Sequence, residues 1–424
     1  MALLIPAERI SARPYNGALF LLTENLLMSA TTTRPRHILP LLVLAQFLGT
    51  SGWFAGNAVL PDLQLAWGLD DQAVAPLTNS VQLGFIAGAL LFAVLALADR
   101  IPPARLFFVC SAGGGVCSLA IAWWAESLTQ LLWLRFVGGV MLAGIYPVGM
   151  KIAAGWYPQG LGRALGYLIG ALVMGTASSH LLSSFAEVDW RRVIEGVGLM
   201  SLAGGVVVLL GVPDGPAAFH GKGLSLADIR IAAGHRPLWL SAGGYFGHMW
   251  ELYAVWAIAP LWLARWAEMN AAEPNLSFYG FLVIAAGGVG CIAGGIWSGR
   301  YGSLGVARLM LALSGLCCLL SPLVMQSGWL LVVLFWLVWG FTVVADSPQF
   351  SALSAQNAPA RVVGSALTLI NCLGYSLTVV AVQVVVFAMN WWPVEWVMWL
   401  LIPGPLLGVW CLSQLRNQVA GPAV

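Results

Sequence analysis

Long apolar stretches recur along the chain, each long enough to cross a bilayer as a helix. A hydrocarbon core about 30 Å thick needs about 20 apolar residues, because an α-helix rises 1.5 Å per residue. Glycine is frequent inside these stretches, as close helix packing in lipid permits, and none alternates like a barrel strand. The pattern predicts about twelve transmembrane helices, at residues 38–60, 73–98, 104–124, 128–155, 163–185, 191–211, 237–264, 276–298, 304–326, 329–353, 361–389 and 393–414.

Composition agrees with an all-α membrane protein. Of the 424 residues, 60% are hydrophobic and only 8% are charged, and the mean hydropathy is +0.86. A soluble domain carries about 25% charged residues, so lipid is the solvent that fits. The net charge of +2 indicates no nucleic acid or other polyanionic partner. The seven cysteines lie in apolar stretches without metal-ligand spacing, so we expect packing residues and neither disulfides, metal nor cofactor.

The distribution of basic residues predicts the orientation of the chain. If the N-terminus is cytoplasmic, 15 of the 19 Lys and Arg residues fall on the cytoplasmic side. The outer side then holds only Arg191, Arg192 and Arg265, while Arg135 lies inside a helix. Because cytoplasmic loops carry the excess of Lys and Arg, the bias predicts a multi-pass inner-membrane protein with both termini in the cytoplasm.

Four segments follow from the spans. Residues 1–37 form a cytoplasmic leader, 38–211 a first six-helix bundle, 212–236 a polar cytoplasmic linker, and 237–424 a second six-helix bundle. An ordinary leader begins only at Met28, and what precedes it is too short and too polar to span. We interpret those first residues as an over-extended start or a disordered tail, since no clean cleavage site for a signal peptide follows.

The two bundles repeat each other in sequence. Four sets of residues recur in order at nearly constant offsets of 197 to 201, the signature of parallel transporter repeats. The matched sets are Pro40 and Trp53 with Pro237 and Trp250, Asp99-Arg100 with Gly299-Arg300, Gly139 and Pro147 with Gly340 and Pro348, and Arg163 and Gly166 with Arg361 and Gly364.

The loop after the second span resembles a motif of the major facilitator superfamily. That family's Gly-x-x-x-Asp-Arg-x-Gly pattern, followed by basic residues, is matched by Asp99, Arg100 and Arg105, although Leu95 and Pro102 replace glycines. The second half repeats it with glycine at the acidic position, and its candidate gating residue is Arg300. The fourth span carries the family's Arg-x-x-x-Gly pattern, from Arg135 to Gly139. The fifth span lacks the Gly-Pro pair of many antiporters.

The resemblance implies two pseudo-symmetric six-helix bundles around a cavity that opens alternately to each side. It further implies that spans one, four, seven and ten line this cavity. Asp99 would accept hydrogen bonds from a neighbouring helix N-terminus and so stabilise one closed state, with Arg100 adding charge-assisted contacts.

Polar and aromatic residues at helical spacing give the candidate cavity lining. Such residues are expensive inside a membrane, so each needs a physical reason. The candidates are Gln46, Thr50, Trp53 and Asn57 in the first span, Arg135 and Tyr146 in the fourth, Tyr245, His248, Trp250 and Glu251 in the seventh, and Thr342, Asp346 and Gln349 in the tenth.

Each candidate has a structural alternative. Tryptophans also serve as packing or interfacial residues, and Arg135 also suits a structural role bonded to backbone carbonyls. Glu251 must be paired or protonated at mid-membrane depth, with His248 one turn away or Arg135 across the cavity as partners. Asp346 lies nearer the cytoplasmic end, where a cavity or a gate role fits.

We predict a secondary transporter that moves a small solute by alternating access. The sequence has no nucleophile elbow, HExxH or P-loop, so it is not an enzyme and ATP is not the energy source. Glu251 and Asp346 are the candidate proton-coupling residues, which favours proton-coupled symport by a monomer driven by the proton gradient. The alternatives are an efflux antiporter, a uniporter, or a non-transporting sensor on the same fold.

The topology yields a first test. A cysteine introduced at Lys222, with the native cysteines removed, should resist membrane-impermeant thiol reagents in intact cells, because the linker is cytoplasmic. Rapid labelling of that cysteine would reverse the predicted orientation.

Overall fold

Helices make up nearly all of the chain that the structure, a computed structural model, describes: residues 35–157, 161–185, 189–215 and 225–419. No strand occurs in these ranges. From Leu39 onward the chain forms one compact unit. The predicted leader up to residue 34 and the test position Lys222 lie outside the described residues.

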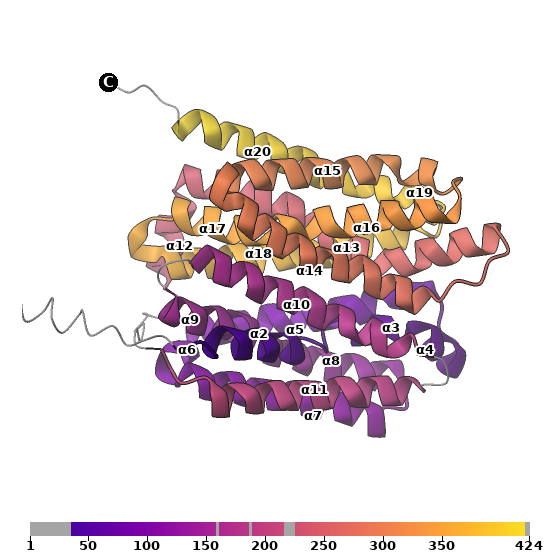
Figure 1. Ribbon diagram of the computed structural model, residues 1–424, viewed down its shortest axis with the longest axis horizontal. Helices are drawn as coiled ribbons and strands as arrows, with labels where there is room; N and C mark the ends of the chain where they lie inside the picture. The colour runs from indigo at the N-terminus through magenta and orange to yellow at the C-terminus, as the bar shows by residue number, and fades with distance from the viewer. Residues whose placement is uncertain (1–34, 158–160, 186–188, 216–224, 420–424) are drawn as a thin grey trace, which may run out of the picture. The chain divides into compact units, whose positions relative to one another are not determined.

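The helices follow one another with short connections (Figure 1). Their bounds are α2 Ile38–Gly49, α3 Ala55–Ala58, α4 Leu60–Trp67, η1 Asp71–Ala73, α5 Val74–Val94, α6 Leu97–Arg100, α7 Pro103–Trp124, α8 Leu128–Leu142, α9 Tyr146–Trp156, α10 Leu161–Ser183, α11 Trp190–Gly211, α12 Leu226–Ala233, α13 Arg236–Met269, α14 Leu276–Tyr301, α15 Ser303–Val324, α16 Trp329–Ala345, α17 Ser347–Asn357, η2 Ala360–Val362, α18 Val363–Ala388, α19 Val394–Val397, η3 Met398–Leu401 and α20 Pro403–Val419.

Among the described residues, ten helical segments are long and apolar enough to cross a membrane. The other two predicted spans are the α2–α3 segment, where α2 is a shorter apolar helix, and α13, which has 34 residues. Polar side chains within α13, including His248 and Glu251, lower its hydropathy. The predicted all-α membrane fold is therefore confirmed.

The first span is broken, contrary to the continuous helix expected over residues 38–60. Helix α2 ends at Gly49, and α3 begins only at Ala55. At the break, the hydroxyl of Thr50 donates to the Gln46 carbonyl at 2.8 Å, and that of Ser51 donates to the Leu48 carbonyl at 2.8 Å. Such side-chain bonds compete with the backbone ladder. The four candidates of this span therefore do not share one helix face.

Two later spans are broken at equivalent places. The fourth span divides into α8 and α9 just before Pro147, and the tenth divides into α16 and α17 just before Pro348. Proline lacks the N–H that would bond the carbonyl four residues earlier, so each break follows from the sequence. At the second break the freed carbonyl of Val344 accepts a bond from the Cys291 thiol, with Sγ 3.3 Å from the oxygen.

Glycines bring pairs of helices into backbone contact in both halves. In the first half α5 packs on α8, where a Cβ at Gly139 would lie 2.1 Å from the Val81 carbonyl oxygen. In the second half α14 packs on α16, where a Cβ at Gly340 would lie 2.1 Å from the Val283 carbonyl oxygen. The matching contacts show the internal repeat in three dimensions.

The two halves meet along two further helix pairs. Helix α10 packs along α14, and α5 packs along α18 (Figure 1). At the first interface the Ser183 and Ser277 hydroxyl oxygens are 3.3 Å apart, and the Asn275 amide donates to the Ser184 carbonyl at 2.7 Å.

The glycine contacts predict that alanine substitutions at two neighbouring residues, Gly138 and Gly139, differ sharply in their effect on the free energy of unfolding. Gly139→Ala should lower the free energy of unfolding by about 1–3 kcal/mol, because the added methyl group forces the backbones of α5 and α8 apart. The control is Gly138→Ala, since a Cβ at Gly138 would meet only the Cys117 Cβ, at 3.9 Å. Thermal unfolding in detergent measures both variants. Equal melting temperatures for them would contradict the proposed packing constraint.

Candidate functional site

A buried polar cluster lies in the second half, where α13 meets the break between α16 and α17. His248 Nδ1 lies 2.9 Å from Asp346 Oδ1, and both side chains are buried. The distance is that of an ion pair, and neither atom has a hydrogen-bond partner among the described residues. On the other side of the ring, Nε2 lies 2.8 Å from the Ser347 hydroxyl oxygen. The break thus presents two consecutive side chains to opposite nitrogens of one imidazole.

Glu251 lies one turn along α13 from His248 and is fully buried. One carboxylate oxygen, Oε2, accepts a bond from the Cys318 thiol of α15 at 3.6 Å, while Oε1 has no hydrogen-bond partner. Asp346 and Ser314 are its other polar neighbours. The side chain therefore points into the second half, toward α15. It pairs with neither His248 nor Arg135 among the described residues.

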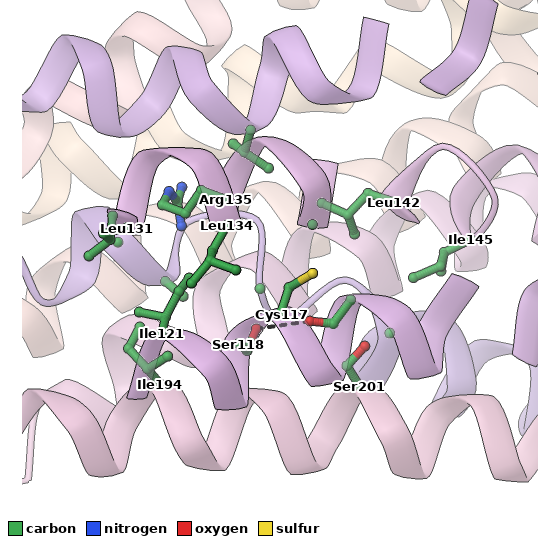
Figure 2. A pocket seen from close by; sticks show the side chains of 17 residues that line it. Cys117, Ser118, Ile121, Leu131, Leu134, Arg135, Leu142, Ile145, Ile194 and Ser201 are labelled. Atoms are coloured by element: carbon green, nitrogen blue, oxygen red, sulfur yellow. Dashed lines mark hydrogen bonds between the residues drawn. The ribbon is translucent and has the colours of Figure 1, made fainter. Parts of the chain in front are cut away.

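Arg135 occupies the interior of the first half. Its Nε donates to the Leu77 carbonyl at 3.0 Å, and one terminal nitrogen, Nη2, donates to the Trp53 carbonyl at 3.0 Å. These bonds join α8 to α5 and to the break after α2 (Figure 2 shows the side chain). This is the structural arrangement that the sequence left open as an alternative, and the side chain also lines a cavity.

The other candidates of the first span lie apart from one another. The Asn57 amide donates to the Thr78 hydroxyl at 2.7 Å, while the Gln46 amide is buried with no partner for either polar atom. The Thr50 hydroxyl also lies 3.3 Å from the Leu172 carbonyl of α10. These residues sit at different helix interfaces rather than along a single cavity wall.

An aromatic layer lies between the two halves. Trp53 stacks on Tyr253, with ring centroids 6.0 Å apart, and on Tyr375, at 5.9 Å. Phe85 packs against Tyr375 at 4.5 Å, and the hydroxyl oxygens of Tyr253 and Tyr375 are 3.2 Å apart. The layer joins α5, α13, α18 and the α2–α3 break. Sequence analysis proposed Trp53 for the cavity but missed its partners Phe85 and Tyr375.

Amide side chains of α5 and the preceding turn bond across to α18, and the sequence analysis missed them as well. Their recurrence at residues 72, 79 and 82 marks one helix face, which is the signal that could have revealed them. The contacts are Gln72 Nε2 to the Val386 carbonyl at 3.1 Å, Asn79 Nδ2 to the Val379 carbonyl at 3.3 Å, and a bond between the Thr378 hydroxyl and Gln82 Oε1.

Several predicted cavity residues have other neighbours. Trp250 donates to the Leu400 carbonyl at 2.9 Å and packs against Gly404, so it faces α20 and not the centre. The Thr342 hydroxyl bonds back to its own helix, at the Val338 carbonyl. Gln349 lies beside α14 with its amide nitrogen unpartnered.

Two tyrosines lie closer to the polar cluster. Tyr146 of α9 reaches the Ser351 hydroxyl of α17, which links the two halves next to the breaks. Tyr245 stacks on the imidazole ring of His248, with centroids 6.2 Å apart. Both remain candidates for contact with a solute.

The loop after α5 pairs differently from the expectation. Asp99 Oδ1 lies 2.6 Å from Lys151 Nζ of α9, which also donates to the Ala98 carbonyl. The structure shows this ion pair in place of the expected bonds from a helix N-terminus. The remaining gating candidates Arg100, Arg105 and Arg300 are exposed.

The described residues contain no group of three or more His, Cys, Asp or Glu side chains arranged to hold a metal ion. What the cluster can do chemically is hold and release protons, because it combines two carboxylates, an imidazole and a hydroxyl away from water.

Comparisons with known proteins identify the family of this chain and a solved structure with a similar fold. The sequence profile of the Major Facilitator Superfamily matches residues 42–382. The crystal structure of a bacterial homologue of the human lysosomal transporter Spinster, in an inward-facing and occupied conformation, superimposes with a TM-score of 0.64. It covers 90% of this chain and 96% of that one at 14% identity, a likeness of fold alone.

The 4-hydroxybenzoate transporter PcaK of Pseudomonas aeruginosa is 28% identical over 184 residues. The aligned stretch is 42% of this chain and spans only 40% of that relative. The chain belongs to the Major Facilitator Superfamily, and its fold is that of a multi-pass membrane protein.

The ion pair between Asp99 and Lys151 predicts a coupled effect on transport. Asp99→Asn and Lys151→Met should each slow initial uptake into proteoliposomes, because either change leaves one half-buried charge unpaired. The double variant should be no slower than either single one, and the half-saturating solute concentration should stay unchanged. Additive losses, or a loss explained by weaker solute binding, would contradict a gating role for this pair.

Proposed function

We propose that the protein is a proton-coupled symporter whose proton site is the cluster of Glu251, Asp346 and His248. The observation that carries this proposal is the charge of the cluster. The two buried carboxylates, Glu251 and Asp346, are electrostatic neighbours, and only Asp346 lies against the imidazole of His248. If all three groups were ionised, a net negative charge would remain buried, which is very costly away from water. Glu251 therefore holds a proton in this conformation.

Alternating access gives that proton a route of release. The cluster lies at the break between α16 and α17, a point where a helix can change direction without breaking a continuous ladder. A movement there would alter the water around Glu251 and its distance from the imidazole, and a hydrated carboxylate ionises readily. Asp346 and His248 would then hold the second charge pair, with Ser347 fixing the orientation of the ring.

The solute is proposed to be small and partly apolar. Aromatic rings near the centre favour such a molecule, because they offer large apolar contacts with few polar ends. The similarity to PcaK over part of the chain makes aromatic acids the first candidates for an uptake screen. We place the protein in the inner membrane, with both termini in the cytoplasm, acting as a monomer.

A proton-flux assay tests the general proposal. Purified protein is reconstituted into proteoliposomes that hold a pH-sensitive dye, and candidate solutes beginning with 4-hydroxybenzoate are added outside. Symport predicts acidification of the lumen on addition of the solute. Alkalinisation would indicate antiport, solute entry without proton movement a uniporter, and binding without entry a sensor. Each of these outcomes overturns symport.

The role of Glu251 is tested by separating coupling from movement. Glu251→Gln keeps the shape of the side chain but removes the proton, so it should abolish solute accumulation driven by a pH gradient. Exchange of labelled for unlabelled solute should continue, because exchange needs no net proton transfer. Both are measured with radiolabelled solute in proteoliposomes.

A matched control lies on the same helix. Glu268 is exposed near the end of α13, paired with Arg265 at 3.2 Å, and Glu268→Gln should leave both activities unchanged. If Glu251→Gln still concentrates solute at the wild-type rate, Glu251 is not the coupling site, and Asp346 becomes the next candidate.

A further inference from the structure

A cavity lies inside the first half, away from the interface between the halves. Its walls come from α2, α3 and the break between them, and from α5, α7, α8 and α11, all in the first half (Figure 2). The acidic cluster of Glu251 and Asp346 contributes nothing to these walls.

Three glycines line this cavity at positions where a larger residue would also fit between the helices. A Cβ at Gly52, Gly114 or Gly138 would make only ordinary contacts, its nearest neighbours being 3.7 to 3.9 Å away. Their sequence neighbours differ. A Cβ at Gly115 of α7 would lie 2.8 Å from a backbone oxygen, and a Cβ at Gly139 of α8 would lie 2.1 Å from one. Close helix packing thus explains Gly115 and Gly139. It does not explain Gly52, Gly114 and Gly138, which all line the cavity.

Arg135 puts a positive charge at the wall of this cavity. Its side chain is 95% buried, and the ion pairs among the described residues do not include it. Two of its nitrogens bond backbone carbonyls, while Nη1 makes no hydrogen bond to any described residue. Gly56 lets the guanidinium lie against the backbone, since a Cβ there would be 2.9 Å from its central carbon. A guanidinium stays charged, so an anion placed beside Nη1 would be stabilised by it.

We propose that this cavity binds a small organic monocarboxylate, with the carboxylate on Arg135 and the apolar part on the surrounding side chains. The walls near Arg135 are apolar, formed by Ile121, Leu131, Leu134 and Ile194 (Figure 2). A single cation, already bonded to two carbonyls, balances one negative charge. Among the described residues that line the cavity there is no second Lys or Arg to balance a phosphate or a dicarboxylate. This binding names a site for the class of acidic solute proposed above, so it rests on that part of the proposed function and not on the proton coupling.

Cys117 provides a native reporter on the cavity wall. Benzoate is the probe, and benzamide is its neutral counterpart of the same shape. Benzoate should slow alkylation of Cys117 by N-ethylmaleimide, measured by peptide mass spectrometry on purified protein. Cys411, a partly exposed thiol of α20 in the other half, is the internal reference and should react unchanged. Benzamide should protect Cys117 at least about tenfold more weakly, which corresponds to about 1.4 kcal/mol.

Two substitutions tie this protection to the site. Arg135→Met should remove the preference for benzoate over benzamide. Gly138→Val should weaken benzoate binding at least about tenfold by filling the cavity. The control is Val137→Leu, which adds volume on the exposed face of the same helix and should change nothing. Calorimetric titration of benzoate measures binding independently of alkylation.

Three outcomes would overturn the proposal. These are no protection of Cys117 by benzoate, equal protection by benzamide, and unchanged benzoate binding in Gly138→Val. None of these measurements depends on proton flux, so failure here leaves the coupling proposal standing, and the reverse also holds.

Discussion

Direct contact between helix backbones is the constraint on which the rest of the structure depends. Within lipid, burying apolar side chains gives little drive for helices to associate, so close van der Waals packing must hold them together. Here α5 meets α8 at Gly139, and α14 meets α16 at Gly340, with no room for a single methyl group. These contacts fix the depth and rotation of α8 and α16. The same two helices carry Arg135 and lead into Asp346, so the glycine contacts also position the charged residues.

The interior separates opposite charges into different halves. The cation Arg135 is held by carbonyl groups of the first half, while both carboxylates, Glu251 and Asp346, belong to the second. The aromatic layer around Trp53 and Tyr253 lies between the halves. No ion pair among the described residues joins Arg135 to either carboxylate, so the two halves do not neutralise each other's buried charge.

Sequence reasoning located the spans and the repeat because both depend on long-range patterns that survive in composition. Hydropathy identifies a span wherever about 20 residues are apolar, whichever neighbours they contact. It does not reveal a helix break such as the one after Gly49, because Thr50 and Ser51 replace only a few backbone bonds and barely change hydropathy. The prolines at 147 and 348 were recognised as repeat markers, and their effect as helix breakers was the signal that was missed.

Side-chain partners were harder to predict than positions. Helical spacing placed Trp250 and Glu251 correctly at mid-helix, but it could not tell which neighbouring helix each would face. Trp250 turned to α20 and Glu251 to α15, because the seventh span is surrounded by helices on several sides. For Asp99, the family pattern suggested a helix N-terminus, whereas Lys151 was the nearer charge. Which groups meet is decided by tertiary packing, and one sequence does not contain that information in readable form.

The thiol of Cys291 has a chemical consequence. It replaces a backbone N–H as donor to the Val344 carbonyl, and a thiol is a weak donor. The backbone contact between α14 and the tenth span also reaches this point, because a Cβ at Gly294 would lie 2.2 Å from the Ala345 carbonyl oxygen. Alkylation or oxidation of Cys291 would remove the thiol hydrogen and place extra atoms between α14 and Val344, two residues before Asp346, so the chemical state of one cysteine bears directly on the surroundings of a buried carboxylate.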